Sequence, residues 1–198
     1  DFTDWRVNEI TNGEVYYFPK FASEKCTSDW HEKLLKLDAW YHPKLKVYGK
    51  EVKQSRSIAA YTSDKKLVVK YSGHTVQLHH DYPPLLLEIQ KQVEDFLGEN
   101  FNHVMLNLYE SGQEYIGKHR DTKENKVSIV ITSLSLGAER TFVMTPNKNN
   151  PGASTHKWTL ANGSLLVMRG KTQDNWKHEI PKEPKVKGGR VSLTFRQL

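Results

Sequence analysis

Residues 190–196 have the sequence Arg190-Val191-Ser192-Leu193-Thr194-Phe195-Arg196, in which apolar and polar side chains alternate strictly. Alternate side chains of a β-strand lie on opposite faces, so the three apolar residues would face a core and the four polar ones would share the other face. Both guanidinium groups would then point into one space, where they suit the carboxylates of a small diacid. The alternation alone leaves open an edge strand with an exposed polar face.

Strand-like segments also precede this one. β-Branched, aromatic and alternating residues fill 101–109, 127–136, 140–145, 157–160 and 164–168. Asn162-Gly163 lies between the last two segments and predicts a hairpin turn. An earlier hairpin is expected over 57–72, with its turn near Ser63-Asp64.

Two segments nearer the start of the chain have helical spacing. Apolar residues at Trp30, Leu34 and Leu37 predict a helix over 23–40, with Ser23 as its N-cap. A second helix is predicted over 83–97, with Asp81 before it and Gly98 after it. Helices first and short strands afterwards predict an α+β fold, a sandwich or jelly-roll backed by two helices.

The composition limits the number of domains and the kinds of protein that this chain can be. A length of 198 residues fits one domain, 1–198, and 37% hydrophobic residues suffice for its core. The chain has no apolar run near the roughly 20 residues of a membrane span, so we expect a soluble protein. Lys and Arg outnumber Asp and Glu by 29 to 23, and the resulting charge of +6 favours a polyanionic partner. The single cysteine, Cys26, excludes an internal disulfide framework.

His119-Arg120-Asp121 places an imidazole and a carboxylate on the same face of an extended segment. His178, between strand-like segments, can supply a third ligand. Two imidazoles and one carboxylate leave coordination positions open, as non-haem Fe(II) oxygenases require, whereas zinc more often takes a closed tetrahedral set. The alternative is that these are surface turn residues. A second His-x-Asp, in His79-His80-Asp81, precedes Pro83-Pro84 and is interpreted as a cap or turn.

Several motifs follow one another in order. They are Asn107-Leu108-Tyr109 followed by Gly112, His119-Arg120-Asp121, Ser133-Leu134-Ser135-Leu136-Gly137, Asn162-Gly163-Ser164-Leu165-Leu166, Trp176-Lys177-His178 and Leu193-Thr194-Phe195-Arg196. In this order and spacing, from about residue 16 to 197, the chain resembles the AlkB-type Fe(II)/2-oxoglutarate dioxygenases, which demethylate nucleic acids.

The resemblance implies a double-stranded β-helix core and a set of roles. His119, Asp121 and His178 would bind Fe(II), and Arg190 with Tyr109 would hold the distal carboxylate of 2-oxoglutarate. Arg196 and Asn107 match the positions that hold the end of the co-substrate nearer the iron, and Ser192 stands in the same pocket. O₂ and 2-oxoglutarate would be converted to succinate and CO₂ while an N-methyl group is hydroxylated and released as formaldehyde.

Residues 55–80 would then form a β-hairpin lid that recognises the nucleotide. Basic and aromatic side chains interleave there, which suits phosphate contacts and base stacking; they are Arg56, Tyr61, Lys65, Lys66, Lys70, Tyr71 and His74. Tyr71 matches the family's base-stacking position, and Arg56 and Tyr61 are further substrate-binding candidates. A solvated ribbon is the structural alternative.

Two positions depart from the family pattern. Lys123 stands where members acting on methylated adenine and cytosine usually carry an acidic residue, and we count it as a substrate-binding candidate. Ser192 stands where many members have Asn, which would alter the co-substrate pocket slightly. The remaining histidines, His103 among them, are taken as surface or capping residues.

The favoured hypothesis is an oxidative demethylase of alkylated DNA or RNA. A 2-oxoglutarate oxygenase acting on proteins or small molecules would keep the iron and arginine residues but need no basic lid. A metal-free nucleic-acid-binding module would explain the charge alone. We expect a monomer of the nucleus or cytoplasm, with no membrane association; the sequence begins at Asp1, so any native targeting segment is expected to be missing.

Overall fold

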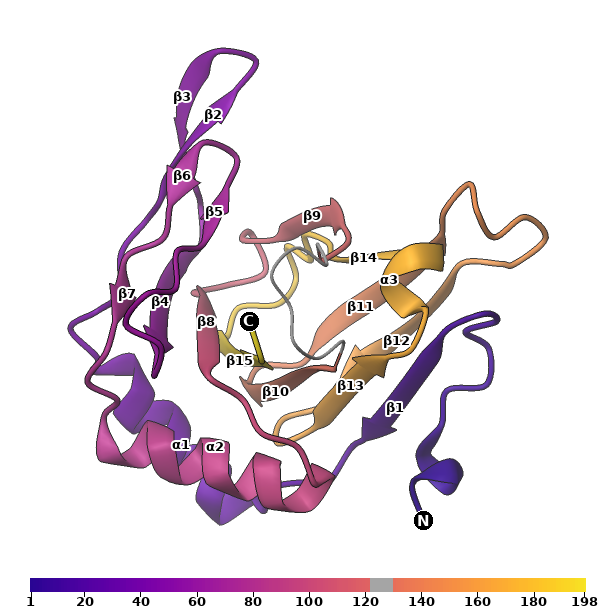
Figure 1. Cartoon of the computed structure of the whole chain (residues 1–198), viewed down its shortest axis with the longest axis horizontal. Helices are drawn as coiled ribbons and strands as arrows, with labels where there is room; N and C mark the ends of the chain where they lie inside the picture. The colour runs from indigo at the N-terminus through magenta and orange to yellow at the C-terminus, as the bar shows by residue number, and fades with distance from the viewer. Residues whose placement is uncertain (122–129) are drawn as a thin grey trace.

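The computed structural model describes residues 1–121 and 130–198, and two antiparallel sheets form its core (Figure 1). The larger sheet has the order β1-β13-β10-β15-β8-β4-β7 and the smaller one β12-β11-β14-β9. The strands of the larger sheet are β1 (Glu14–Phe18), β13 (Leu165–Arg169), β10 (Ile131–Gly137), β15 (Arg190–Arg196), β8 (His103–Tyr109), β4 (Ser57–Thr62) and β7 (Leu78–His79). Those of the smaller sheet are β12 (His156–Leu160), β11 (Arg140–Pro146), β14 (Trp176–Ile180) and β9 (Ile116–His119). Among the strands of the described residues, β7 alone pairs in parallel, with β4.

Two apolar clusters hold the layers together. Val15, Ile131 and Leu166 of the larger sheet pack with Phe142 and Trp176 of the smaller one, so the sheets share a core as in a jelly-roll. The other face of the larger sheet packs against the helices α1 (Glu24–Leu35) and α2 (Pro84–Leu97), at the lower left of Figure 1. The predicted α+β jelly-roll backed by two helices is therefore confirmed. No helix in 1–121 or 130–198 is both long and apolar enough to cross a membrane.

The helices differ from their predictions at the ends. Ser23 is the N-cap of α1 as expected and accepts a hydrogen bond from the Cys26 amide. The helix ends at Leu35 instead of continuing to residue 40, because the Trp40 indole folds back and donates to the Leu34 carbonyl at 3.0 Å. Asp81 does not cap α2, which begins after Pro83 without any side-chain cap. Gly98 ends this helix in the left-handed conformation, at φ 68°.

The predicted hairpin over 57–72 is wrong. All six residues of β4 are buried, and this strand pairs with β8 and β7 instead of with the segment that follows it. The hairpin in this region is β5 (Lys70–Tyr71) with β6 (His74–Thr75), turning at Ser72 and Gly73, both of which have positive φ. A further hairpin, β2 (Lys44–Val47) with β3 (Lys50–Lys53), was not predicted. Both project from one edge of the fold, at the upper left of Figure 1.

The turn at Asn162-Gly163 does not make a hairpin either. Gly163 has a positive φ of 81°, and the Ser164 amide donates to the Ala161 carbonyl at 3.1 Å, so a turn is present. The strands on its two sides belong to different sheets, since β12 pairs with β11 and β13 pairs with β1 and β10. The chain uses this turn to pass from one layer of the jelly-roll to the other.

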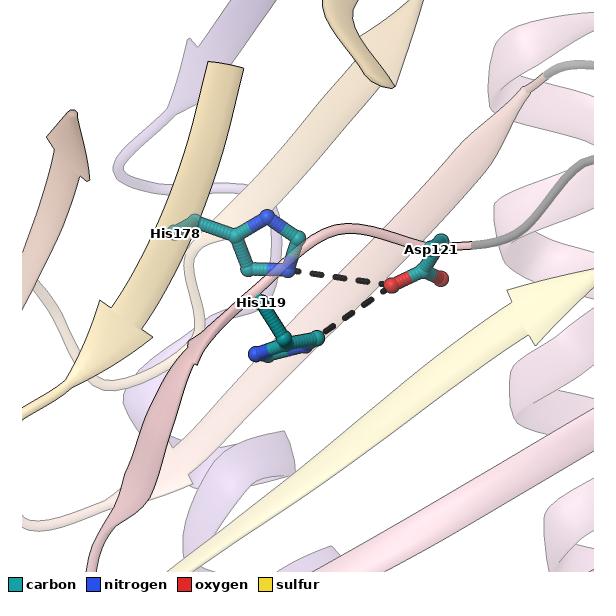
Figure 2. Close-up of side chains that lie close together, drawn as sticks. All are labelled: His119, Asp121 and His178. Atoms are coloured by element: carbon teal, nitrogen blue, oxygen red, sulfur yellow. Dashed lines mark ion pairs between the residues drawn. The ribbon is translucent and has the colours of Figure 1, made fainter. Parts of the chain in front are cut away.

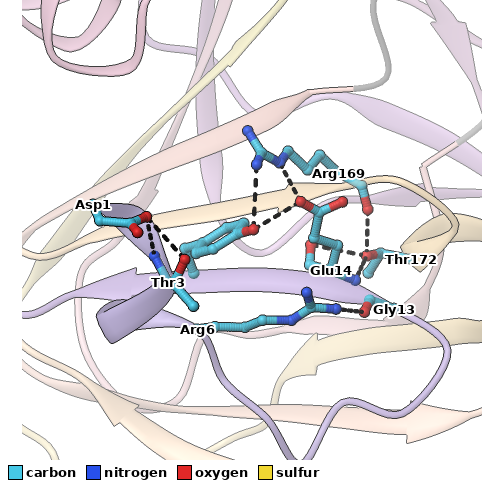
Figure 3. Close-up of polar contacts among 8 residues, drawn as sticks. Asp1, Thr3, Arg6, Gly13, Glu14, Arg169 and Thr172 are labelled. Carbon is cyan, nitrogen blue, oxygen red and sulfur yellow. Dashed lines mark hydrogen bonds and ion pairs between the residues drawn. The ribbon is translucent and has the colours of Figure 1, made fainter.

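A polar cluster secures β1 to the larger sheet (Figure 3). The Glu14 carboxylate accepts from the Arg169 guanidinium at 2.6 Å and from the Tyr16 hydroxyl at 2.8 Å. Burial raises the pKa of Glu14, but the two hydrogen bonds and the positive charges of Arg169 and Arg6 together outweigh it, so its pKa lies below the ordinary value. Thr172 of α3 (Thr172–Asn175) joins the same cluster through the Glu14 backbone. This end of the sheet is thereby linked to the segment that leads into β14.

Candidate metal centre and co-substrate cavity

Three potential metal ligands converge where β9 and β14 pair. His119 is the last residue of β9, His178 is its partner in β14, and Asp121 follows two residues after His119. Their ligand atoms all lie within 4.8 Å of one another, and the Asp121 Oδ1 is 3.8 Å from the Nε2 atom of each imidazole (Figure 2). Within 1–121 and 130–198 this is the single such group, so His79 and Asp81 form no second one.

The pattern of β14 explains why His178 points inward. Trp176 and Ile180 pack in the core between the sheets, while Lys177 is exposed and Glu179 half-buried. His178 shares the inner face with the two apolar residues, and its ring stacks on Phe142 with centroids 5.6 Å apart. The strand was missed in the sequence, although the alternation of Trp176, His178 and Ile180 with charged residues was a usable signal.

His119 is oriented by its own backbone. Its Nδ1 lies 2.7 Å from the Gly117 carbonyl, which leaves Nε2 facing Asp121. Burial lowers the pKa of His119, so the ring is neutral near pH 7 and has a lone pair for a metal ion.

Arg196 orients the carboxylate of Asp121. Its Nε and Nη2 atoms donate to Oδ2 at 2.8 and 2.6 Å, and the Asp121 amide donates to the Gln173 side chain at 2.9 Å. The second oxygen, Oδ1, therefore faces the two imidazoles. The donor set of two imidazoles and one carboxylate, on one side of a common point, fits a ferrous ion with open positions.

The polar face of β15 lines a small cavity next to these ligands. Its volume is about 80 Å³, and its walls include Arg190, Ser192, Thr194, Arg196, Asn107, Tyr109, His119, Asp121 and His178. The opposite face of β15 carries Val191, Leu193 and Phe195, which are fully buried under the helices. Because β15 lies between β10 and β8, the edge-strand alternative is wrong.

Arg190 is a buried cation whose charge is only partly compensated. It is 2% exposed, its Nη2 donates to the Ser135 hydroxyl at 2.9 Å, and its Nε has no hydrogen-bond partner. Burial lowers the pKa of Arg190, against the opposing effect of Tyr109, whose ring centroid is 5.3 Å away. A buried guanidinium is costly unless an anion reaches it. The site thus suits one carboxylate of a co-substrate.

Arg140, which the sequence did not single out, lies on the same Tyr109 ring at 5.4 Å. It is 1% exposed and donates to the carbonyls of Ser111, Glu114 and Pro181. It also forms an ion pair with Glu183 at 3.3 Å. Arg140 therefore joins the segment before β9 to the segment after β14, and so holds together the two strands that carry the imidazoles.

A larger groove of about 810 Å³ opens beside the ligands on the side of the hairpins. Arg56 and Tyr71 line it, together with residues 67–72 and with Asn107, His119, Asp121 and Arg196. The Arg56 Nε donates to the Asn107 side chain at 2.8 Å, and the Tyr71 hydroxyl donates to the Gln54 side chain at 3.1 Å. These two predicted substrate residues are thus beside the metal ligands.

The other two substrate candidates do not lie there. Tyr61 is 3% exposed and belongs to the core under the helices, where its ring packs against His79 and Tyr82. Its assignment to the substrate site is wrong, because β4 turns that side chain inward. Lys123 lies outside the described residues.

His103 is the residue whose interpretation changes most. It is 1% exposed, not a surface residue, and it lines the larger groove. Burial and the nearby charge of Arg196 lower the pKa of His103 to about 3. The spacing was informative, since His103, Met105, Asn107 and Tyr109 share one face of the predicted strand over 101–109.

Comparison with known proteins agrees with this geometry. A family model described as the 2OG-Fe(II) oxygenase superfamily matches residues 14–196. Human DNA oxidative demethylase ALKBH2 is 36% identical over 162 residues, covering 78% of this chain and 61% of the relative. ALKBH2 of Arabidopsis thaliana is 29% identical and human alpha-ketoglutarate-dependent dioxygenase alkB homolog 3 is 31% identical; each match covers 66% of the relative and more than nine tenths of this chain. The chain thus spans 61% to 66% of the length of these three relatives.

Solved structures share the fold. A structure described as OsALKBH1 superposes with a TM-score of 0.67 at 20% identity, over 92% of this chain and 97% of that one. A prolyl hydroxylase from Trichoplax adhaerens, in complex with a peptide fragment, superposes with a TM-score of 0.65 at 14% identity, over 98% of this chain and 87% of that one. At such low identity the likeness concerns the arrangement of the strands.

Proposed function

Because this chain belongs to the 2OG-Fe(II) oxygenase superfamily, in its AlkB-type branch that depends on Fe(II) and 2-oxoglutarate, we propose that it removes alkyl groups oxidatively from the bases of nucleic acid. One observation carries the proposal: the three converging ligands and the arginine-lined cavity open into a groove bordered by basic and aromatic side chains. The printed names of the relatives, DNA oxidative demethylases among them, support the same substrate class.

In this proposal His119, Asp121 and His178 bind the ferrous ion. The ion, when bound, would supply the redox chemistry by which O₂ and 2-oxoglutarate hydroxylate a C–H bond of the alkyl group, with one oxygen atom going to that bond, the other to succinate, and CO₂ released. The hydroxylated N-alkyl group then loses its carbon as an aldehyde and returns the base nitrogen to N–H. The His119 imidazole, which burial keeps neutral, and a carboxylate already held by Arg196 need little reorganisation to bind the ion.

Two ends of the cavity suit the two carboxylates of 2-oxoglutarate. Arg190 would pair with the distal carboxylate, because it is buried with an unpaired Nε and has Tyr109 beside it. Arg196 and Asn107 line the part of the cavity next to Asp121 and would hold the end nearer the iron, with Ser192 between.

The nucleic acid would lie along the hairpin side of the groove. Tyr71 would stack on the extruded base, and Arg56 would hold the strand near Asn107. The hairpin β2–β3 would form part of this recognition surface together with β5–β6, the hairpin within the 55–80 range predicted as a lid; β4, in the same range, is a buried strand. The hairpin β2–β3 carries Lys44, Lys46, Lys50 and Lys53, and Tyr48 at its tip is 100% exposed. Acting on nucleic acid, a monomer of this kind would work in the nucleus or the cytoplasm.

Mass spectrometry of a mixed set of N-alkylated DNA and RNA oligonucleotides, incubated with Fe(II), ascorbate and 2-oxoglutarate, tests the proposal. We expect loss of the alkyl group together with succinate formation, and neither with His178→Ala. Succinate formation without any repaired oligonucleotide would favour a protein or small-molecule substrate. Oligonucleotide binding that weakens steeply with salt separates these two substrate classes independently.

A further inference from the structure

His103 lies on the floor of the larger groove, beside the proposed metal site. It is on the same face of β8 as Asn107 and Tyr109, which line the inner cavity. Its cross-strand neighbour on β15 is Arg196, the residue that holds Asp121, and facing Cβ atoms in such a pair are about 5 Å apart. The imidazole is therefore one side chain away from the carboxylate that would bind the metal.

Its surroundings give this imidazole no polar partner. Neither Nδ1 nor Nε2 has a hydrogen bond among the described residues, although the side chain is buried. Ile58, Met105 and Leu198 are its apolar companions in the lining of the groove. Buried polar groups are almost always satisfied, so an imidazole whose two nitrogens have no hydrogen bond to the described residues suits a partner supplied by a ligand in the groove.

The chemistry of the ring limits what that partner can be. Burial keeps the imidazole uncharged at neutral pH, so one nitrogen donates and the other accepts a hydrogen bond. An uncharged group of this kind does not attract a phosphate. It matches the edge of a nucleobase, where amines and carbonyls alternate, and the groove is already bordered by Tyr71, whose ring can stack on a base.

We propose that His103 is a specificity-determining residue, which hydrogen-bonds the amine- or carbonyl-bearing edge of the alkylated base held in the groove. This inference rests on the proposed function and names the contact that would distinguish one base from another. A site that hydrogen-bonds its substrate inside an apolar pocket discriminates strongly against a base that leaves the polar group unpaired.

The test compares kcat/KM for oligonucleotides carrying N1-methyladenine, N3-methylcytosine, N1-methylguanine or N3-methylthymine, of which the first two have an exocyclic amine and the last two carbonyls. In wild type we expect a clear preference between the amine and carbonyl pairs. His103→Phe and His103→Leu, which remove the polar atoms, should bring that ratio at least about tenfold closer to one. His103→Asn and His103→Gln, which restore a donor and an acceptor, should recover part of the discrimination.

Two results would overturn the inference while leaving the proposed function intact. One is an unchanged ratio in a folded apolar variant; the other is an equal loss on all four bases, which would mean that His103 only packs against Arg196. Thermal unfolding of each variant shows which apolar variant is folded and can be used. If wild type itself repairs none of the four bases while producing succinate, the proposed function fails first and this inference with it.

Discussion

Arg140 and Arg190 both lie on the Tyr109 ring, but they have different roles at this site. Arg140 donates hydrogen bonds to three backbone carbonyls and forms an ion pair with Glu183, so its charge is compensated within the protein. Arg190 has a serine hydroxyl and an aromatic face, with Nε unpaired. The first guanidinium is structural, and the second is the one available to a ligand.

Arg190→Ala should raise the KM for 2-oxoglutarate about 100-fold, because truncating one partner of a buried charge pair costs on the order of 3 kcal/mol. Initial rates of succinate formation at increasing 2-oxoglutarate concentration measure this effect. The KM for the oligonucleotide should change much less. An equal increase in both constants would show that the residue does not hold the co-substrate.

His103 predicts a dependence of stability on pH. Its pKa is lowered to about 3 in the folded protein, whereas the unfolded chain binds the proton near the ordinary value of 6.5. The unfolded state therefore carries the extra proton below about pH 6.5, and folding stability falls as the pH falls through this window. The contribution of this group is fully present above pH 6.5.

The measurement is urea unfolding of wild type and His103→Phe at pH 7 and pH 5, without metal. Between these values wild type should lose about 1.4 kcal/mol more than the variant for each pH unit below 6.5. Parallel losses in the two proteins would mean that the ring is protonated, or partnered, in the folded state.

At the scale of elements, alternation predicted β8, β10, β11, β12, β13 and β15 to within a few residues, but it did not predict how they pair. The hairpin expected at 57–72 fails because β4 pairs with the distant strand β8, and the one at Asn162-Gly163 fails because β12 and β13 belong to different sheets. β9 was missed because Ile116–His119 has only four residues and no apolar alternation. Local sequence sets which face of a strand is apolar, whereas long-range packing sets its neighbour.

For the site, too, the sequence predicted which side chains share a face of a strand, but not their partners in the fold. The faces of β8 and β15 placed Asn107, Tyr109, Arg190 and Arg196 together, and they do line one cavity. Tyr61 could not be placed, because a strand buried on both faces gives no polar alternation. His103 and Arg140 were missed since their roles depend on partners that only the folded chain brings near.

The lysines of the hairpin β2–β3 should contribute to the salt dependence of nucleic-acid binding. Lys50→Gln with Lys53→Gln should reduce the slope of log affinity against log salt by up to about 0.9 for each lysine that contacts a phosphate of duplex DNA. Fluorescence anisotropy of a labelled oligonucleotide at several salt concentrations gives the slope.

The matched control is Lys33→Gln with Lys91→Gln, which removes the same charge from α1 and α2, away from the hairpin tips in Figure 1. This pair should leave the slope unchanged. Equal effects of both double variants would indicate a general charge effect instead of a contact surface.

At the scale of the whole molecule, both sheets contribute residues to the site. His119 and His178 belong to the smaller sheet, whereas Arg190 and Arg196, which flank the cavity, belong to the larger one. Binding of a metal ion with 2-oxoglutarate would therefore add polar links between layers that already meet through an apolar core and through the Arg196–Asp121 ion pair. The cavity therefore lies at the contact between the two sheets, and a molecule bound in it would touch both.

Hydrogen exchange tests this coupling. Mn(II) with 2-oxoglutarate should slow amide exchange in 116–121, 176–180 and 190–196, which lie on both sheets, and should leave the amides of α1 little changed. Asp121→Ala should abolish the protection in all three segments. Protection limited to the smaller sheet would show that the co-substrate does not bridge the layers.

Gly112 sets the spacing between the two segments that lead to the imidazoles. Its amide donates to the Val186 carbonyl and its carbonyl accepts from the Glu183 amide, each at 2.8 Å, and a Cβ atom here would overlap the Glu183 carbonyl. A methyl group at this position would force the loops apart and carry β9 away from β14. The missing side chain thus lets the loop before β9 lie directly on the loop after β14, and this close backbone contact favours the pairing of the two strands that carry His119 and His178.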